Sequence, residues 1–115
     1  MNKKEIKALE EIKTTVGASQ IFEYLARTNK KKFNFSKLAE ELTELNEICL
    51  KYINKKKEFK PTKEKFIEEI GDVRIRLGIL EQALGINVLD ISNRIIFKAN
   101  KFLEYIKEDK YDKGI

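Results

Sequence analysis

The chain has 115 residues, of which 42% are hydrophobic and 37% are charged, and its formal net charge is +5. This length suits one domain over residues 1–115, and a single Pro with five Gly leaves little material for the frequent turns of an all-β fold. No apolar run approaches the ~18 residues of a membrane span, and the first residues lack the apolar stretch of a signal peptide, so we expect a cytoplasmic protein without membrane contact.

The N-terminal segment, residues 1–30, places apolar side chains at helical spacing. It predicts one helix, or two helices with a break near the Gly17-Ala18-Ser19 run. The three lysines at 30–32 are expected to lie in a connection between helices. The second helix is predicted to begin near Asn34 or Ser36, because both are favourable N-cap residues.

The remaining boundaries follow from proline, glycine and capping signals. The second helix is expected to run to about residue 54. Pro61 indicates a new helix start, over about residues 62–84, and therefore two antiparallel helices rather than one long coiled coil. Gly85 is expected to stop that helix, and Asn87 resembles the cap of a fourth helix.

These elements favour an all-α fold, a bundle of four to five helices with its core helices over residues 34–106. Gly71 and Gly78 fall inside the third predicted helix, where each costs about 1 kcal/mol relative to Ala. Close approach of another helix, space beside acidic side chains and simple tolerance are all consistent with glycine at these positions.

An eight-residue pattern occurs twice, 28 positions apart, at residues 38–45 and 66–73. Each copy reads apolar, any residue, Glu, Glu, apolar, any residue, acid, apolar. On a helix, acids three apart lie on neighbouring turns, so each copy presents a pair of carboxylates in one direction. The two pairs comprise four candidate site residues: Glu41, Glu44, Glu69 and Asp72.

The position of these acids on their helices follows from the apolar stripes. The first stripe is centred on Leu42 and the second on Ile70, and the inner acids are expected at the edges of the stripes. Glu40 and Glu68 are predicted to point towards solvent. The lone Cys49 lies on the first stripe and is expected to be reduced and buried.

The chemistry open to this chain is limited because it contains no histidine. That excludes Ser-His and Cys-His catalysis, His-ligated zinc and Glu-x-x-His di-iron bundles. Converging carboxylates instead suit hard divalent cations. The alternative is a solvated acidic face with salt bridges to lysines such as Lys37 and Lys65.

The two motifs together resemble the MazG-like family of all-α nucleoside triphosphate pyrophosphohydrolases, over about residues 36–105. The resemblance implies cleavage of NTPs or dNTPs between the α and β phosphates, with Mg²⁺ or alternatively Mn²⁺ as cofactor. It also implies a homodimer or a dimer of dimers. The residues that it implies are the catalytic metal ligands Glu41, Glu44, Glu69 and Asp72, and the phosphate-binding residues Arg94, Lys98 and Lys101 on one face of the last helix.

A second hypothesis is a non-catalytic helical interaction protein or a lysine-rich nucleic-acid-binding module on the same fold. The positive net charge favours it. The excess is lysine spread along the chain, with only four arginines, and this disfavours a nucleic-acid partner. The hypothesis predicts salt-sensitive binding to DNA or RNA without Mg²⁺-dependent hydrolysis.

Overall fold

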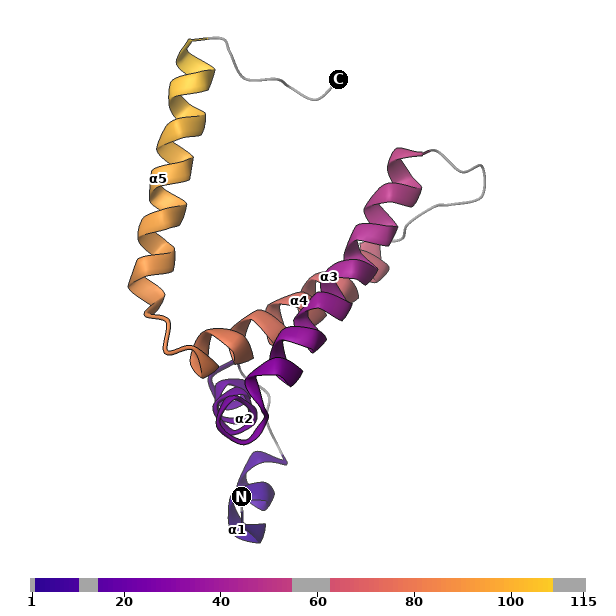
Figure 1. Ribbon diagram of the computed structural model, residues 1–115, viewed down its shortest axis with the longest axis vertical. Helices are drawn as coiled ribbons and strands as arrows, with labels where there is room; N and C mark the ends of the chain where they lie inside the picture. The colour runs from indigo at the N-terminus through magenta and orange to yellow at the C-terminus, as the bar shows by residue number, and fades with distance from the viewer. Residues whose placement is uncertain (1, 11–14, 55–62, 109–115) are drawn as a thin grey trace. The chain divides into compact units, whose positions relative to one another are not determined.

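A computed structural model describes residues 2–10, 15–54 and 63–108 of the protein (Figure 1). These residues contain no strand, which confirms the predicted all-α class. They form five helices: α1 (Lys3–Leu9), α2 (Thr15–Thr28), α3 (Lys31–Ile53), α4 (Lys63–Ala83) and α5 (Val88–Lys107). None of these described helices has the length and apolar character that crossing a membrane requires.

The chain divides into two compact units, Met1–Gly85 and Ile86–Ile115. In the first unit, α3 packs along α4, and α2 packs against α4 as well. The end of α3 and the start of α4 lie at the same end of the pair, so the two helices are antiparallel as predicted (Figure 1). A single domain over residues 1–115 stays a prediction.

The N-terminal helix boundaries differ from those predicted. The Gly17-Ala18-Ser19 run lies inside α2, so the break predicted there is wrong. α3 begins at Lys31 rather than near Asn34 or Ser36, and its N-cap residue Lys30 makes no side-chain capping hydrogen bond. The lysines at 31 and 32 are therefore helical. Asn34 is buried inside α3, so tertiary packing uses this side chain in place of the local cap.

The later boundaries agree with the sequence signals. Asn54 is the C-cap residue of α3. Gly85 follows α4 with a φ of +64°, a left-handed conformation that glycine adopts without steric cost. The Asn87 side chain accepts a hydrogen bond of 2.9 Å from the Leu89 N–H and caps α5. The predicted helix start at Pro61 lies outside the described residues.

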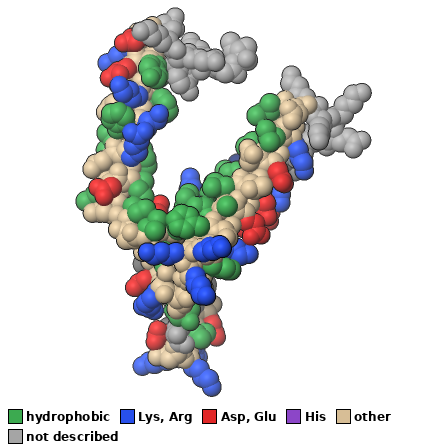
Figure 2. Space-filling view, in the orientation of Figure 1, with side chains coloured by type: hydrophobic (Ala, Val, Ile, Leu, Met, Phe, Trp, Pro, Cys, Tyr) green, Lys and Arg blue, Asp and Glu red, His purple; other side chains and the backbone are tan. Residues whose placement is uncertain are grey.

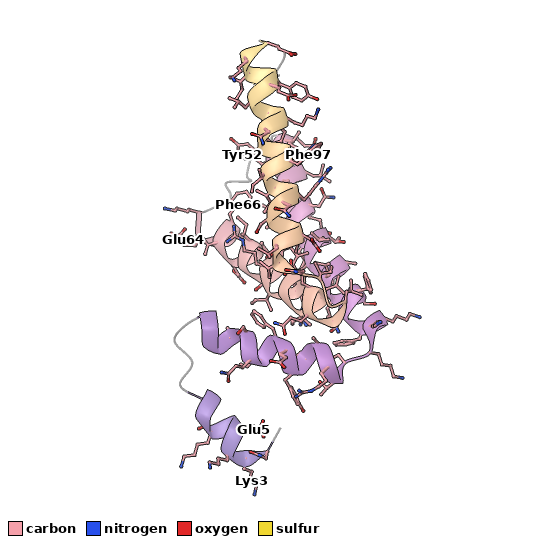
Figure 3. All side chains as sticks on the ribbon, turned by 90° about the vertical axis from the view of Figure 1, so that its left-hand side faces the viewer. Lys3, Glu5, Tyr52, Glu64, Phe66 and Phe97 are labelled. Atoms are coloured by element: carbon pink, nitrogen blue, oxygen red, sulfur yellow. The ribbon has the colours of Figure 1, made fainter. Side chains whose placement is uncertain are left out.

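Along one side of each of α3 and α4, buried and half-buried positions are spaced alternately three and four residues apart, as in the seam of a coiled coil. In α3 they are Asn34, Leu38, Glu41, Leu45 and Ile48. In α4 they include Phe66, Glu69, Val73, Arg76 and Leu80. Ile79 of α4, at 1% exposure, is buried outside this spacing. Figure 3 shows Phe66 near the start of α4 and Tyr52 near the end of α3, at the same end of the helix pair.

This seam is rotated relative to the predicted apolar stripes. Leu42 and Ile70, the predicted stripe centres, are 45% and 41% exposed, and Cys49 is exposed rather than buried. The predicted burial of these three side chains is therefore wrong. Each helix carries apolar residues around more than one face, and packing through the adjacent face moves the inner acids from the stripe edge into the seam.

The α2–α4 contact depends on a glycine. A Cβ placed on Gly78 would lie 3.3 Å from Cδ2 of Phe22, so the α2 ring occupies space that only glycine leaves. At Gly71, in contrast, no described atom outside the glycine's own surroundings lies within 4 Å of such a Cβ. Close helix approach, one of the roles considered for these glycines, is thus confirmed at Gly78.

We expect Gly71→Ala to raise the free energy of unfolding by roughly 1 kcal/mol, because Ala is the better helix former and its methyl group meets open space. Gly78→Ala should raise the free energy of unfolding clearly less than Gly71→Ala, or should lower it, because its methyl group must displace the Phe22 ring. Urea denaturation of the two variants measures this difference. Equal gains at the two positions would contradict the close approach of α2.

Candidate metal centre

Three of the four predicted acids converge between α3 and α4. Glu41 of α3 and Glu69 and Asp72 of α4 each offer a carboxylate oxygen, and these oxygens lie within 4.8 Å of one another. Ligand oxygens on opposite sides of one divalent ion are about 4–5 Å apart. The trio therefore fits a shared cation with only small side-chain movements. In Figure 2, acidic side chains gather on the α3–α4 pair beside a band of hydrophobic side chains.

The burial of this trio points to a missing positive charge. Glu69 is only 4% exposed, and Glu41 is half-buried. The Oε2 atoms of both glutamates are buried and accept no hydrogen bond from the described residues. A buried carboxylate oxygen without a partner costs several kcal/mol of desolvation free energy. A divalent cation would supply the partner, and an all-oxygen donor set suits Mg²⁺ or Mn²⁺.

Glu44, the fourth predicted acid, lies at the border of the trio. Its carboxyl is exposed, and the pKa of Glu44 is raised above the ordinary 4.5, chiefly by repulsion from Glu41. Loss of solvation, repulsion from Glu69 and a hydrogen bond with Glu41 also raise this pKa. Glu44 is therefore electrostatically coupled to acids from both helices, although it is not one of the three converging ligands.

The outer acid of each repeat points to solvent, as predicted. Glu40 pairs with Lys37 at 3.2 Å, and Glu68 pairs with Lys65 at 3.9 Å. Exposed pairs of this kind contribute roughly 0–1 kcal/mol to stability. The solvated-face alternative thus describes the outer acids, and its predicted ion pair with Lys65 is also present at the inner acid Glu69, where Nζ lies 2.9 Å from Oε1. It does not account for the buried Oε2 atoms of Glu41 and Glu69, which have no partner among the described residues.

One buried polar residue of the seam was not predicted from the sequence. Asn34 is 1% exposed, and its Oδ1 accepts a hydrogen bond of 3.5 Å from Nδ2 of Asn29. Its own Nδ2 donates to none of the described groups. Counting back one heptad from Glu41 reaches Asn34, so a seam register through the acids could have predicted its burial.

The predicted phosphate-binding residues lie on α5, in the second unit. Arg94 and Lys101 lie over the Phe97 ring, at 5.1 and 5.7 Å from its centroid, and Lys98 lies 5.6 Å from that of Phe102. Figure 3 labels Phe97 on this helix. The three cations share one side of α5, as their spacing predicted, and neighbouring aromatic rings hold them there. No residue of α5 is buried.

We expect Glu69→Leu to raise the free energy of unfolding of the metal-free protein, by about 1–3 kcal/mol. A buried carboxylate with one unpartnered oxygen is less stable in a helix seam than an apolar side chain. Urea denaturation in EDTA provides the measurement. Glu68→Leu, at the exposed neighbouring position, is the matched control and should not gain stability. A large decrease in the free energy of unfolding of Glu69→Leu would contradict the view that one Glu69 carboxylate oxygen is buried without a partner.

The raised pKa of Glu44 predicts a pH dependence of the metal-free protein. The folded state binds this proton more tightly than the unfolded state, so the contribution of Glu44 to stability is present at acid pH and is lost as the pH rises through its raised pKa. The stability of Glu44→Gln should equal that of wild type at low pH and should exceed it by an increasing amount as the pH rises towards neutral. Thermal unfolding in EDTA across this range tests the trend, and a constant difference would contradict it.

Comparisons with known proteins identify no relative of this chain. No protein-family model matches it, and no curated protein and no solved structure matches it. The functional interpretation therefore depends on the paired acidic motifs and on the geometry of Glu41, Glu69 and Asp72.

Proposed function

We propose that this chain is a Mg²⁺-dependent nucleoside triphosphate pyrophosphohydrolase of the MazG-like type. It would cleave NTPs or dNTPs between the α and β phosphates to give a monophosphate and pyrophosphate. The observation that carries the proposal is the convergence of Glu41, Glu69 and Asp72 around buried, unpartnered carboxylate oxygens. Structural acids normally remain solvated or paired, whereas cation ligands must be held together before the cation arrives.

The proposed roles of the four acids are to hold the cation and to position a water molecule. Glu41, Glu69 and Asp72 would hold Mg²⁺, or alternatively Mn²⁺. Such an ion supplies positive charge for phosphate oxygens and lowers the pKa of a bound water. Because the chain has no histidine, a carboxylate would have to orient the attacking water or accept its proton. Glu44, exposed beside the trio, suits either this task or that of a fourth ligand.

The proposed triphosphate-binding residues are the three basic residues on one side of α5. Arg94, Lys98 and Lys101 would bind phosphate oxygens and stabilise the charge that develops on the leaving pyrophosphate. The stacking of Arg94 and Lys101 on Phe97 supports this role, because the ring limits the conformations of two long side chains. A small-molecule nucleotide, rather than a nucleic acid, is the proposed partner.

We also propose that the protein acts as a homodimer or a dimer of dimers. Large apolar side chains remain exposed on α3 and α4 beside the seam, among them Leu42, Ile70 and Leu77. Figure 2 shows a hydrophobic band along these helices. Contiguous exposed apolar surface commonly marks an interface. Two α3–α4 pairs joined through this surface would complete a four-helix bundle of the MazG-like type.

Pyrophosphate release from the eight common NTPs and dNTPs, with Mg²⁺ and with EDTA, tests the proposal. We expect Mg²⁺-dependent release from at least one nucleotide. Glu41→Gln and Asp72→Asn should each lower the rate by at least about 100-fold, because each removes a charged ligand while keeping the shape of the side chain. Glu40→Gln, adjacent to Glu41 but exposed, is the matched control and should retain activity.

Two results would contradict the proposal. Activity that survives in Glu41→Gln or Asp72→Asn would exclude the assigned site. No Mg²⁺-dependent release from any nucleotide, together with salt-sensitive binding to DNA or RNA, would instead favour the non-catalytic nucleic-acid-binding alternative.

A further inference from the structure

Lys65 places a positive charge at the rim of the acid cluster. Its Nζ lies 2.9 Å from Oε1 of Glu69 and 3.9 Å from Oε2 of Glu68. The Lys65 side chain is half-exposed, whereas the Glu69 side chain is buried. The ammonium group therefore reaches inwards from solvent to the most buried carboxylate of the trio.

Two local features of α4 weaken this contact without preventing it. Lys65 lies in the first turn of α4, where a positive charge opposes the helix dipole. A Lys that precedes a Glu by four residues is also the weaker orientation of a helical ion pair. The attraction that holds the contact comes chiefly from Glu68 and Glu69 of α4, and Glu44 of α3 adds a smaller part. The pKa of Lys65 is raised chiefly by its hydrogen bond to Glu69, then by the charges of Glu68 and Glu69, with a smaller effect from Glu44 of α3.

The repeat contains a second lysine in the same register that behaves differently. Lys37 and Lys65 are 28 positions apart, as are the acids that follow them. Lys37 pairs with the outer acid Glu40 at 3.2 Å and lies over the Phe33 ring. Lys65 instead reaches the inner acid Glu69. The two copies are thus equivalent in sequence, but only the second directs its lysine to the converging oxygens.

We propose that the Lys65 ammonium is the internal counter-cation of the acid cluster and competes with a divalent cation for Glu69. This inference rests on the cation site of the proposed function. Without metal, Lys65 offsets part of the Glu69 charge and reduces the repulsion among the three carboxylates. A divalent cation at the trio is repelled by the Lys65 ammonium. Lys65 therefore acts as a positioning residue that sets the cation concentration at which the site fills.

Binding of Mn²⁺ alone to the full chain, followed by the electron paramagnetic resonance signal of the free ion, tests the inference. Lys65→Gln should bind Mn²⁺ more tightly than wild type, on the order of 3- to 10-fold, because the competing charge is gone. Lys65→Arg keeps the charge and should remain within about 2-fold of wild type by the same reasoning. Lys37→Gln removes the same charge at the equivalent position of α3, and its Mn²⁺ affinity should be unchanged.

Thermal unfolding of the same variants gives an independent readout. In EDTA, Lys65→Gln should unfold at a lower temperature than Lys37→Gln, and saturating Mn²⁺ should remove this difference. If Lys65→Gln folds only when Mn²⁺ is present, the inference is supported, because the cluster then requires a cation from either source.

Several outcomes would overturn the inference. One is equal or weaker Mn²⁺ binding by Lys65→Gln, and another is Lys65→Arg binding as tightly as Lys65→Gln. Absence of Mn²⁺ binding in every variant would also overturn it. The proposed function fails separately: tighter Mn²⁺ binding by Lys65→Gln, with no pyrophosphate release by wild type, keeps the Lys65 inference and removes the hydrolase.

Discussion

Two glutamates occupy the seam through which the antiparallel helices α3 and α4 pack. Glu41 and Glu69 hold positions that an apolar residue would fill in an ordinary helix pair. The aliphatic side chains that share the seam, including Leu38 and Val73, offset this loss by contributing about 1.5–3 kcal/mol each when fully buried. The seam therefore holds the two helices together and keeps their carboxylates within reach of one ion.

The acids of each repeat differ in solvation although they are neighbours in sequence. The outer residues, Glu40 and Glu68, remain in water and pair with lysines, so their charge costs little. One residue further along each helix, 100° of rotation carries Glu41 and Glu69 into the seam. Their unpartnered oxygens and the raised pKa of Glu44 have the same origin, which is negative charge gathered without enough positive charge. Lys65 supplies part of that charge at Glu69, where a divalent ion would compete with it.

Both helices carry more apolar surface than their mutual contact covers. Leu42 and Ile70 remain 45% and 41% exposed beside the seam. Exposed apolar surface of this kind commonly marks an interface. The proposed oligomer follows from the same geometry that forms the acid cluster, because packing through the acid-bearing face leaves the more apolar face for another partner.

The sequence by itself determined the all-α class, the end of α4 and the start of α5, because Gly85 and Asn87 act through local backbone geometry. It also determined that the inner acids occupy equivalent positions, since 28 residues are four heptads. Only the tertiary structure decided which helix face is buried, because a helix with apolar residues on two faces can pack through either. That choice moved the inner acids into the seam, buried Asn34 in place of a cap, and directed Lys65 rather than Lys37 to the cluster.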